Sequence, residues 1–103
     1  MTDQPRNPLF DVNPPASAEA EKALLGSVLI NPEVFLTISA FLKADDFYFL
    51  RHSHIWTAML RLSERRQPID PELLADELEN VRQLEAIGGR AYIAELTNST
   101  PTS

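Results

Sequence analysis

Cysteine is absent from this sequence of 103 residues, so neither a disulfide framework nor a thiolate metal site is possible. Basic side chains are few, because nine lysines and arginines stand against fifteen acidic residues and leave a formal net charge of −6. Nucleic-acid binding by counterion release requires a basic face, which this balance does not supply. The sequence therefore argues against direct DNA binding and fits a reducing compartment.

Long hydrophobic runs are also missing. The longest apolar stretches, such as "ALLGSVLI", fall far short of the roughly 20 residues that span a membrane. The beginning, "MTDQPRNPLFDVNPP", is polar and rich in proline, and it lacks the basic segment followed by an apolar one that marks a secretory signal. We expect a cytoplasmic protein with no membrane partner.

Helical periodicity is what the sequence does contain. Apolar residues recur at every third or fourth position in several segments, and no segment alternates convincingly as a strand does. The patterns predict helices over about residues 17–30, 32–42, 51–65, 71–80 and 90–97. The predicted fold class is all-α, a compact single-domain bundle of about five to seven short helices. The predicted division is a disordered lead at 1–15, the helical domain at 16–98 and the start of a linker at 99–103.

Local signals predict where these helices begin. Ser17 is expected to be the N-cap of the first helix. A capping residue followed by proline at the first helical position occurs twice, in Asn31-Pro32 and in Asp70-Pro71. Asp45-Asp46 is expected to cap a single turn that carries Phe47 into the core.

The spacing also predicts which side chains are buried. Phe41 shares the apolar face of the second helix, while Trp56 and Leu60 lie on the apolar stripe of the central helix. At this spacing, the aromatic residues are expected to form the packing itself instead of a ligand pocket. On this interpretation, Leu60→Ala should lower the free energy of unfolding by about 2 to 5 kcal/mol, as truncation of a buried leucine does.

The pair Gly88-Gly89 stands directly before the apolar segment "RAYIAEL" and raises the question of a phosphate-binding loop. A P-loop requires Gly-x-x-x-x-Gly-Lys-Ser/Thr, but the two lysines, Lys22 and Lys43, follow no glycine loop. A dinucleotide fingerprint needs three spaced glycines between a strand and a helix, which are also missing. The pair is therefore predicted to be a corner that uses positive φ to turn the chain into the last helix.

Other candidates for chemistry do not form a site. His52 and His54 are two positions apart on a predicted helix, so they point to different faces and cannot grip one metal ion as an i, i+4 pair does. Asp76, Glu77 and Glu79 are interpreted as a solvated helix face, because no nucleophile or base stands beside them. We therefore predict no catalytic, cofactor-binding or metal-binding residue in this chain.

The order of the local signals resembles the N-terminal domain of the bacterial replicative DNA helicase of the DnaB family. The resemblance covers about residues 13 to 103 and rests on several elements in order. These are Pro14-Pro15, Glu19-Ala20-Glu21, Leu25-Gly26, Asp46-Phe47-Tyr48 with His52 and His54, Gly88-Gly89 with Tyr92, Glu95 and Leu96, and Thr100-Pro101.

One position departs from the family pattern. Where many members have glycine in a Gly-x-Leu stretch, this sequence has Arg82 before Gln83-Leu84. A left-handed backbone at Arg82 would cost about 1 kcal/mol against glycine. The sequence favours instead that Asn80 takes the strained position or that the helix continues by a few residues.

The resemblance implies a role in DNA replication. In the family, this domain is the collar of a hexameric, ATP-driven 5′ to 3′ DNA helicase, where it pairs with neighbouring subunits and docks the C-terminal domain of primase in the primosome. ATP and Mg²⁺ belong to a motor domain that this sequence does not contain, so the chain by itself is expected to be no enzyme. By resemblance, Arg90, Tyr92 and Glu95 are the expected partner-binding residues; the alternative is that Tyr92 only packs against the first helix.

A second function stays open at this point. The chain could be a free-standing helical adaptor or helicase-loader-type interaction protein with the same fold. A longer gene product with GxxxxGK[ST] after a linker would favour the helicase domain over the adaptor.

Overall fold

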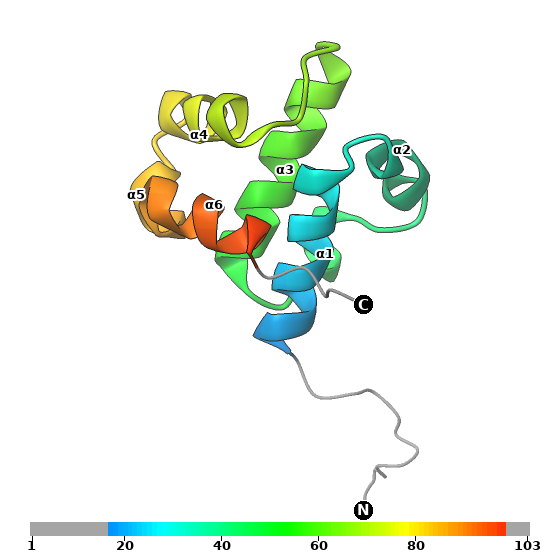
Figure 1. Ribbon diagram of the computed structural model, residues 1–103, viewed down its shortest axis with the longest axis horizontal. Helices are drawn as coiled ribbons and strands as arrows, with labels where there is room; N and C mark the ends of the chain where they lie inside the picture. Colours follow the sequence, from blue (N-terminus) through cyan, green and yellow to red (C-terminus); the bar gives the residue numbers. More distant parts are fainter. Residues whose placement is uncertain (1–16, 99–103) are drawn as a thin grey trace, which may run out of the picture.

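A computed structural model describes residues 17–98, which form an all-helical domain (Figure 1). Within this range there are six α-helices, one 3-10 turn and no strand, so the predicted fold class is confirmed. The elements are α1 (Ala18–Ile30), α2 (Val34–Ser39), η1 (Ala44–Asp46), α3 (Leu50–Glu64), α4 (Pro71–Asn80), α5 (Leu84–Ile87) and α6 (Gly89–Thr97). The predicted lead at 1–15 and linker at 99–103 lie outside the described residues.

The long helix α3 is the centre of the bundle (Figure 1). Helices α1, α4 and α5 and the turn η1 all contact α3. Helix α6 packs against both α1 and α4, and α2 lies at the edge of the bundle beside α1. The first and last described helices are therefore neighbours in space, which brings residues far apart in the sequence into one layer.

Two of the predicted helix starts are confirmed by side-chain hydrogen bonds. The Ser17 hydroxyl accepts from the backbone N–H of Ala20 at 3.1 Å, and the Asp70 carboxylate accepts from the N–H of Leu73 at 2.8 Å. These caps satisfy N–H groups that have no partner within their own helix. In η1 the N-cap is Lys43 instead of the predicted Asp45-Asp46, and Asp46 contributes from within the turn, where its carboxylate accepts from the N–H of Lys43 at 2.8 Å. Phe47 is buried directly after the turn, as predicted.

The second helix is shorter than predicted. It ends at Ser39, and Phe41 and Leu42 both donate their backbone N–H to the carbonyl of Ile38, which closes the chain into a turn. Because Phe41 lies beyond the helix end, it leaves the apolar face and is 71% exposed. Its predicted burial was therefore wrong. The helix also begins later, since Glu33 and not Asn31 is its N-cap.

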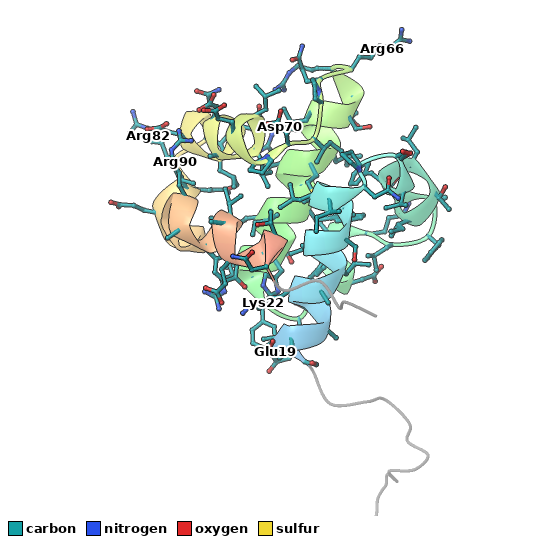
Figure 2. The ribbon with its side chains drawn as sticks, in the orientation of Figure 1. Glu19, Lys22, Arg66, Asp70, Arg82 and Arg90 are labelled. Carbon is teal, nitrogen blue, oxygen red and sulfur yellow. The ribbon has the colours of Figure 1, made fainter. Side chains whose placement is uncertain are left out.

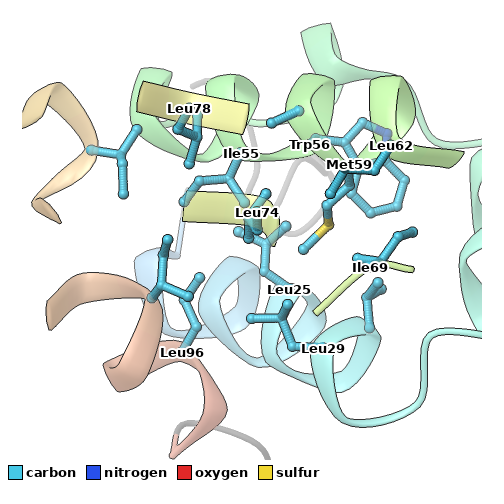
Figure 3. Packing of buried hydrophobic residues seen from close by; sticks show 14 of the residues in the cluster. Leu25, Leu29, Ile55, Trp56, Met59, Leu62, Ile69, Leu74, Leu78 and Leu96 are labelled. Atoms are coloured by element: carbon cyan, nitrogen blue, oxygen red, sulfur yellow. The ribbon is translucent and has the colours of Figure 1, made fainter. Parts of the chain in front are cut away.

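The core is a single cluster of apolar side chains around α3 (Figure 3). Trp56 is its largest member, and its ring contacts Phe35 with centroids 4.7 Å apart and Phe47 with centroids 5.5 Å apart. Trp56 is thus part of the packing, as predicted. Leu60 is not part of the core, because 39% of it is exposed, so its predicted burial was wrong and we expect a smaller loss of stability for Leu60→Ala.

Helices α3 and α4 end in the same unusual way. Arg66 has φ 59° and Arg82 has φ 61°, in the left-handed region where glycine is normally found. In each case the following residue donates its N–H across the turn, Gln67 to Leu62 at 2.8 Å and Gln83 to Leu78 at 2.8 Å. The left-handed backbone at each arginine lowers the stability of the fold by about 1 to 2 kcal/mol relative to an unstrained backbone. The prediction that Asn80 would take the strain, or that the helix would continue, was wrong.

Candidate docking surface around α6

The corner before α6 depends on two glycines. Gly88 has φ 110° and Gly89 has φ 74°, which confirms that the pair turns the chain by positive φ. A Cβ atom built on Gly88 would lie 2.9 Å from the Cβ of Tyr92, whereas a Cβ on Gly89 would meet nothing within 4 Å. Gly88 is therefore required for two reasons, because its backbone adopts a positive φ and because a side chain at this position would overlap with Tyr92.

Tyr92 ends a buried chain of polar groups. Its hydroxyl lies 2.5 Å from Nε2 of His52, and Nδ1 of the same imidazole lies 2.7 Å from the Glu21 carboxylate. A carboxylate only accepts, so Nδ1 donates to Glu21, and the Tyr92 hydroxyl can then donate to Nε2 of the neutral ring. His52 is completely buried, and this pairing satisfies both of its nitrogens.

The Glu21 carboxylate also holds the segment that leads into α3. It accepts from the backbone N–H of Tyr48 at 2.7 Å and from that of Phe49 at 3.4 Å. One side chain on α1 thus bonds the start of α3 and, through His52, reaches α6. The three groups come from positions 21, 52 and 92 and form a polar connection between three helices.

Cations surround the rim of Tyr92. The Arg51 guanidinium lies 4.1 Å from the centre of the Tyr92 ring, a cation–π contact, and the Lys22 ammonium forms an ion pair with Glu95. The hydrogen bond with Glu95 raises the pKa of Lys22, and the same bond lowers the pKa of Glu95. Burial raises the pKa of the Tyr92 phenol. The ion pair ties the exposed edge of α6 to α1.

Arg90 faces the opposite side of α6. Its guanidinium lies 3.0 Å from Asp76 and 3.5 Å from Glu79, both on α4, and the hydrogen bond with Asp76 raises its pKa. Figure 2 shows Arg90 well away from Lys22. The structure therefore does not gather the three expected partner-binding residues into one cluster. Arg90 and Glu95 are exposed toward different neighbours, and Tyr92 is buried with 5% of its surface exposed.

Sequence reasoning missed a buried ion pair on α4. Glu77 was interpreted as part of a solvated face, but it is only 5% exposed. Its carboxylate accepts from Nε of Arg61 at 2.6 Å and from Arg65, and these hydrogen bonds, that of Arg65 first, lower its pKa. A usable signal was its spacing, because Glu77 stands four residues after Leu73 and three after Leu74 on the inward stripe. The pair joins α3 to α4.

The two histidines are separate in the structure, as predicted. His52 is buried, whereas His54 is half-buried, and no group of three or more potential metal ligands occurs within residues 17–98. In the same range, no helix combines the length and the apolar character needed to cross a bilayer. The fold and its buried polar contacts thus define a small all-helical domain in which polar side chains join neighbouring helices.

The comparisons with known proteins show the family. A family model described as "DnaB-like helicase N terminal domain" matches residues 13–103, and the chain belongs to this family. It is 40% identical over 95 residues to the replicative DNA helicase DnaC of Bacillus subtilis (strain 168), covering 92% of this chain and 21% of that protein. It is 42% identical over 90 residues to the replicative DNA helicase DnaB of Geobacillus stearothermophilus, covering 87% of this chain and 20% of that protein.

A solved structure supports the same conclusion. The crystal structure of the N-terminal domain of DnaB helicase from Mycobacterium tuberculosis matches with a TM-score of 0.82 and 32% identity, covering 87% of this chain and 65% of that one. The resemblance inferred from the sequence is therefore confirmed, as is the helical fold. The chain spans about a fifth of the length of the two helicases above, and it corresponds to their domain without the motor.

Proposed function

We propose that this chain is the non-catalytic N-terminal domain of a hexameric, ATP-dependent replicative DNA helicase. Its role is the assembly of helicase subunits and the docking of the primase C-terminal domain in the primosome during DNA replication in the cytoplasm. The observation that carries this proposal is the family match over residues 13–103. In the complete helicase, ATP and Mg²⁺ would be bound by the motor domain.

Two properties support a non-catalytic role. The sequence contains no Gly-x-x-x-x-Gly-Lys-Ser/Thr stretch to hold nucleotide phosphates, and its charge of −6 disfavours binding to the DNA backbone. The buried ionisable side chains His52 and Glu77 are both bonded to other helices. Their positions support a structural use, because a general acid or base must reach a substrate.

The partner-binding surface in this proposal is the exposed part of α6. Arg90 and Glu95 each leave 53% of their side chains exposed, so a partner can contact them while their ion pairs hold α6 in place. Tyr92 supports this surface from within, because its ring and hydroxyl are bonded inside the bundle. We therefore assign Tyr92 to the positioning of α6 and assign direct contact to its charged neighbours.

Light scattering and calorimetric titration with the purified C-terminal domain of primase test this function. We expect the 103-residue chain to fold, to remain smaller than a hexamer and to bind the primase domain weakly, because several linked copies can raise apparent affinity by about 100-fold or more. The double variant Arg90→Ala, Glu95→Ala should weaken binding several-fold, whereas Glu64→Ala at the end of α3 should not. Absence of any binding at concentrations near 1 mM, or equal binding by both variants, would contradict the proposal.

A further inference from the structure

An open groove of about 490 Å³ lies between the first half of α4 and α6. Its apolar lining consists of Ala75, Ile93 and Ala94, together with Pro71. Ala75 and Ile93 are buried beneath the groove, whereas Ala94 is exposed in its wall. Small side chains on both helices leave space for two or three side chains of a second molecule, within the size range of binding clefts in proteins.

The rim of this groove is acidic. Glu72 lines the groove, the exposed acids Asp76 and Glu79 follow it along α4, and the one cation in the lining is Arg90 on α6. Arg90 forms ion pairs with Asp76 and Glu79 and interacts with Glu72 only by longer-range attraction, so one cation faces three carboxylates. Asp70 adds a further carboxylate at the end of the groove, where it caps α4. An occupant must therefore combine small apolar side chains with positive charge.

A second copy of this chain does not offer such an occupant among residues 17–98. Most cations in this range are already engaged, as Arg61 and Arg65 are bonded to Glu77 and Lys22 is bonded to Glu95. The remaining exposed cations do not form a row along one helix, because Lys43, Arg66 and Arg82 stand on three separate turns and Arg51 on α3 lies over the ring of Tyr92. Charge complementarity thus favours a different protein.

We propose that the groove between α4 and α6 docks a short amphipathic helix of a partner protein, with small apolar side chains against the apolar lining and lysine or arginine toward Glu72 and Asp76. A helix fits better than an extended peptide, because the described residues contain no sheet edge that could add a strand. This proposal deepens the docking role given above and rests on it, since it names the kind of segment that a partner presents.

The test uses an 18-residue helical peptide of leucine, alanine and lysine, and a matched peptide with glutamate in place of lysine. Each is titrated into the ¹⁵N-labelled 103-residue chain at low salt, and amide shifts are followed by NMR. We expect the cationic peptide to move resonances of residues 71–76 and 90–94, with a dissociation constant of about 100 μM or below, and the anionic peptide to move none.

Matched variants make the test specific. Ala94→Trp fills the groove and should weaken the cationic peptide at least about tenfold, whereas Ala91→Trp places the same side chain on an exposed site of α6 outside the groove lining. Glu72→Gln should weaken binding several-fold, and Glu64→Gln on α3 should leave it unchanged. Circular dichroism checks that each variant keeps its helical content.

Three results would overturn the groove as a docking site: equal binding of both peptides, shifts that map to another surface, or unchanged binding by Ala94→Trp. The primase titration separates this failure from failure of the proposed function. If the primase domain binds while Ala94→Trp changes neither its affinity nor that of the peptide, the groove is wrong and the helicase role stands. If the peptide binds in the groove but the primase domain does not bind at all, the groove stands and primase docking is refuted.

Discussion

Removal of one hydroxyl group tests the buried polar connection between α1, α3 and α6. In Tyr92→Phe the ring keeps its place in the core, but Nε2 of His52 loses its only partner at 2.5 Å. His52 is completely buried, so water cannot replace the lost bond without opening the bundle. A buried polar group left without a partner costs about 1 to 3 kcal/mol. That is a large share of the roughly 5 to 15 kcal/mol that stabilise an ordinary small domain.

Thermal and urea unfolding followed by circular dichroism at 222 nm measure this loss. In a domain of this size, 1 kcal/mol shifts the midpoint of thermal unfolding by about 4 to 8 °C, so Tyr92→Phe should lower it by about 5 to 20 °C. Tyr48→Phe is the matched control, because Tyr48 is 74% exposed and loss of its hydroxyl should change stability by less than about 0.5 kcal/mol. Equal midpoints for the two variants would show that the His52–Tyr92 bond does not stabilise the fold.

Three further predictions concern the core, the corner and acid stability. Leu74→Ala, at a fully buried position, should lower the free energy of unfolding by about 2 to 5 kcal/mol, and Leu60→Ala by less than about 1.5; similar losses in urea melts would contradict the assigned faces. Gly88→Ala should lower the free energy of unfolding by about 2 to 4 kcal/mol, because the new Cβ strains the backbone and overlaps with Tyr92. Gly89→Ala should lower it by only about 1 to 2 kcal/mol, because it strains the backbone without overlap. A larger loss for Gly89→Ala in calorimetry would refute the geometry of this corner. Hydrogen bonds from Arg65 and Arg61 lower the pKa of Glu77 in the folded protein, so the ionised carboxylate stabilises the fold above its ordinary pKa of 4.5, and this stabilisation is lost as pH falls through the lowered pKa. Glu77→Gln should therefore make the free energy of unfolding depend less on pH in this acid range. The same dependence on pH in the variant and the parent protein would contradict the role of Glu77.

The starts of α1 and α4 are the features that sequence reasoning predicts best. Ser17 and Asp70 cap their helices by accepting from N–H groups three positions later, whereas Asp46 accepts from the N–H of Lys43, three positions earlier, at the start of its short turn. Such contacts lie within one turn of the chain, so a single sequence contains all the information that they need. The predicted burial of Phe41 failed because local spacing alone does not show where a helix ends. The apolar spacing continues past Ser39, but the helix ends there.

The surface around α6 was predicted less well. Family resemblance pointed to Arg90, Tyr92 and Glu95, but it could not separate the buried residue from the two exposed ones. The burial of Tyr92 depends on Gly88, which leaves room for its side chain, and on His52, which lies 40 positions earlier in the chain. The direction of each charged side chain likewise depends on which helix lies beside it.

The sequence by itself determined that this chain is a helical domain of the DnaB-like helicase family, because caps, periodicity and the order of short motifs are local properties. Only the tertiary structure decided that Glu77 is buried with two arginines, that Arg82 adopts a left-handed backbone, and that an acidic groove opens between α4 and α6. The physical reason is that each of these features depends on how separate helices pack together. The periodicity of a single helix does not show which of its side chains will pack against another helix and which will be exposed to water.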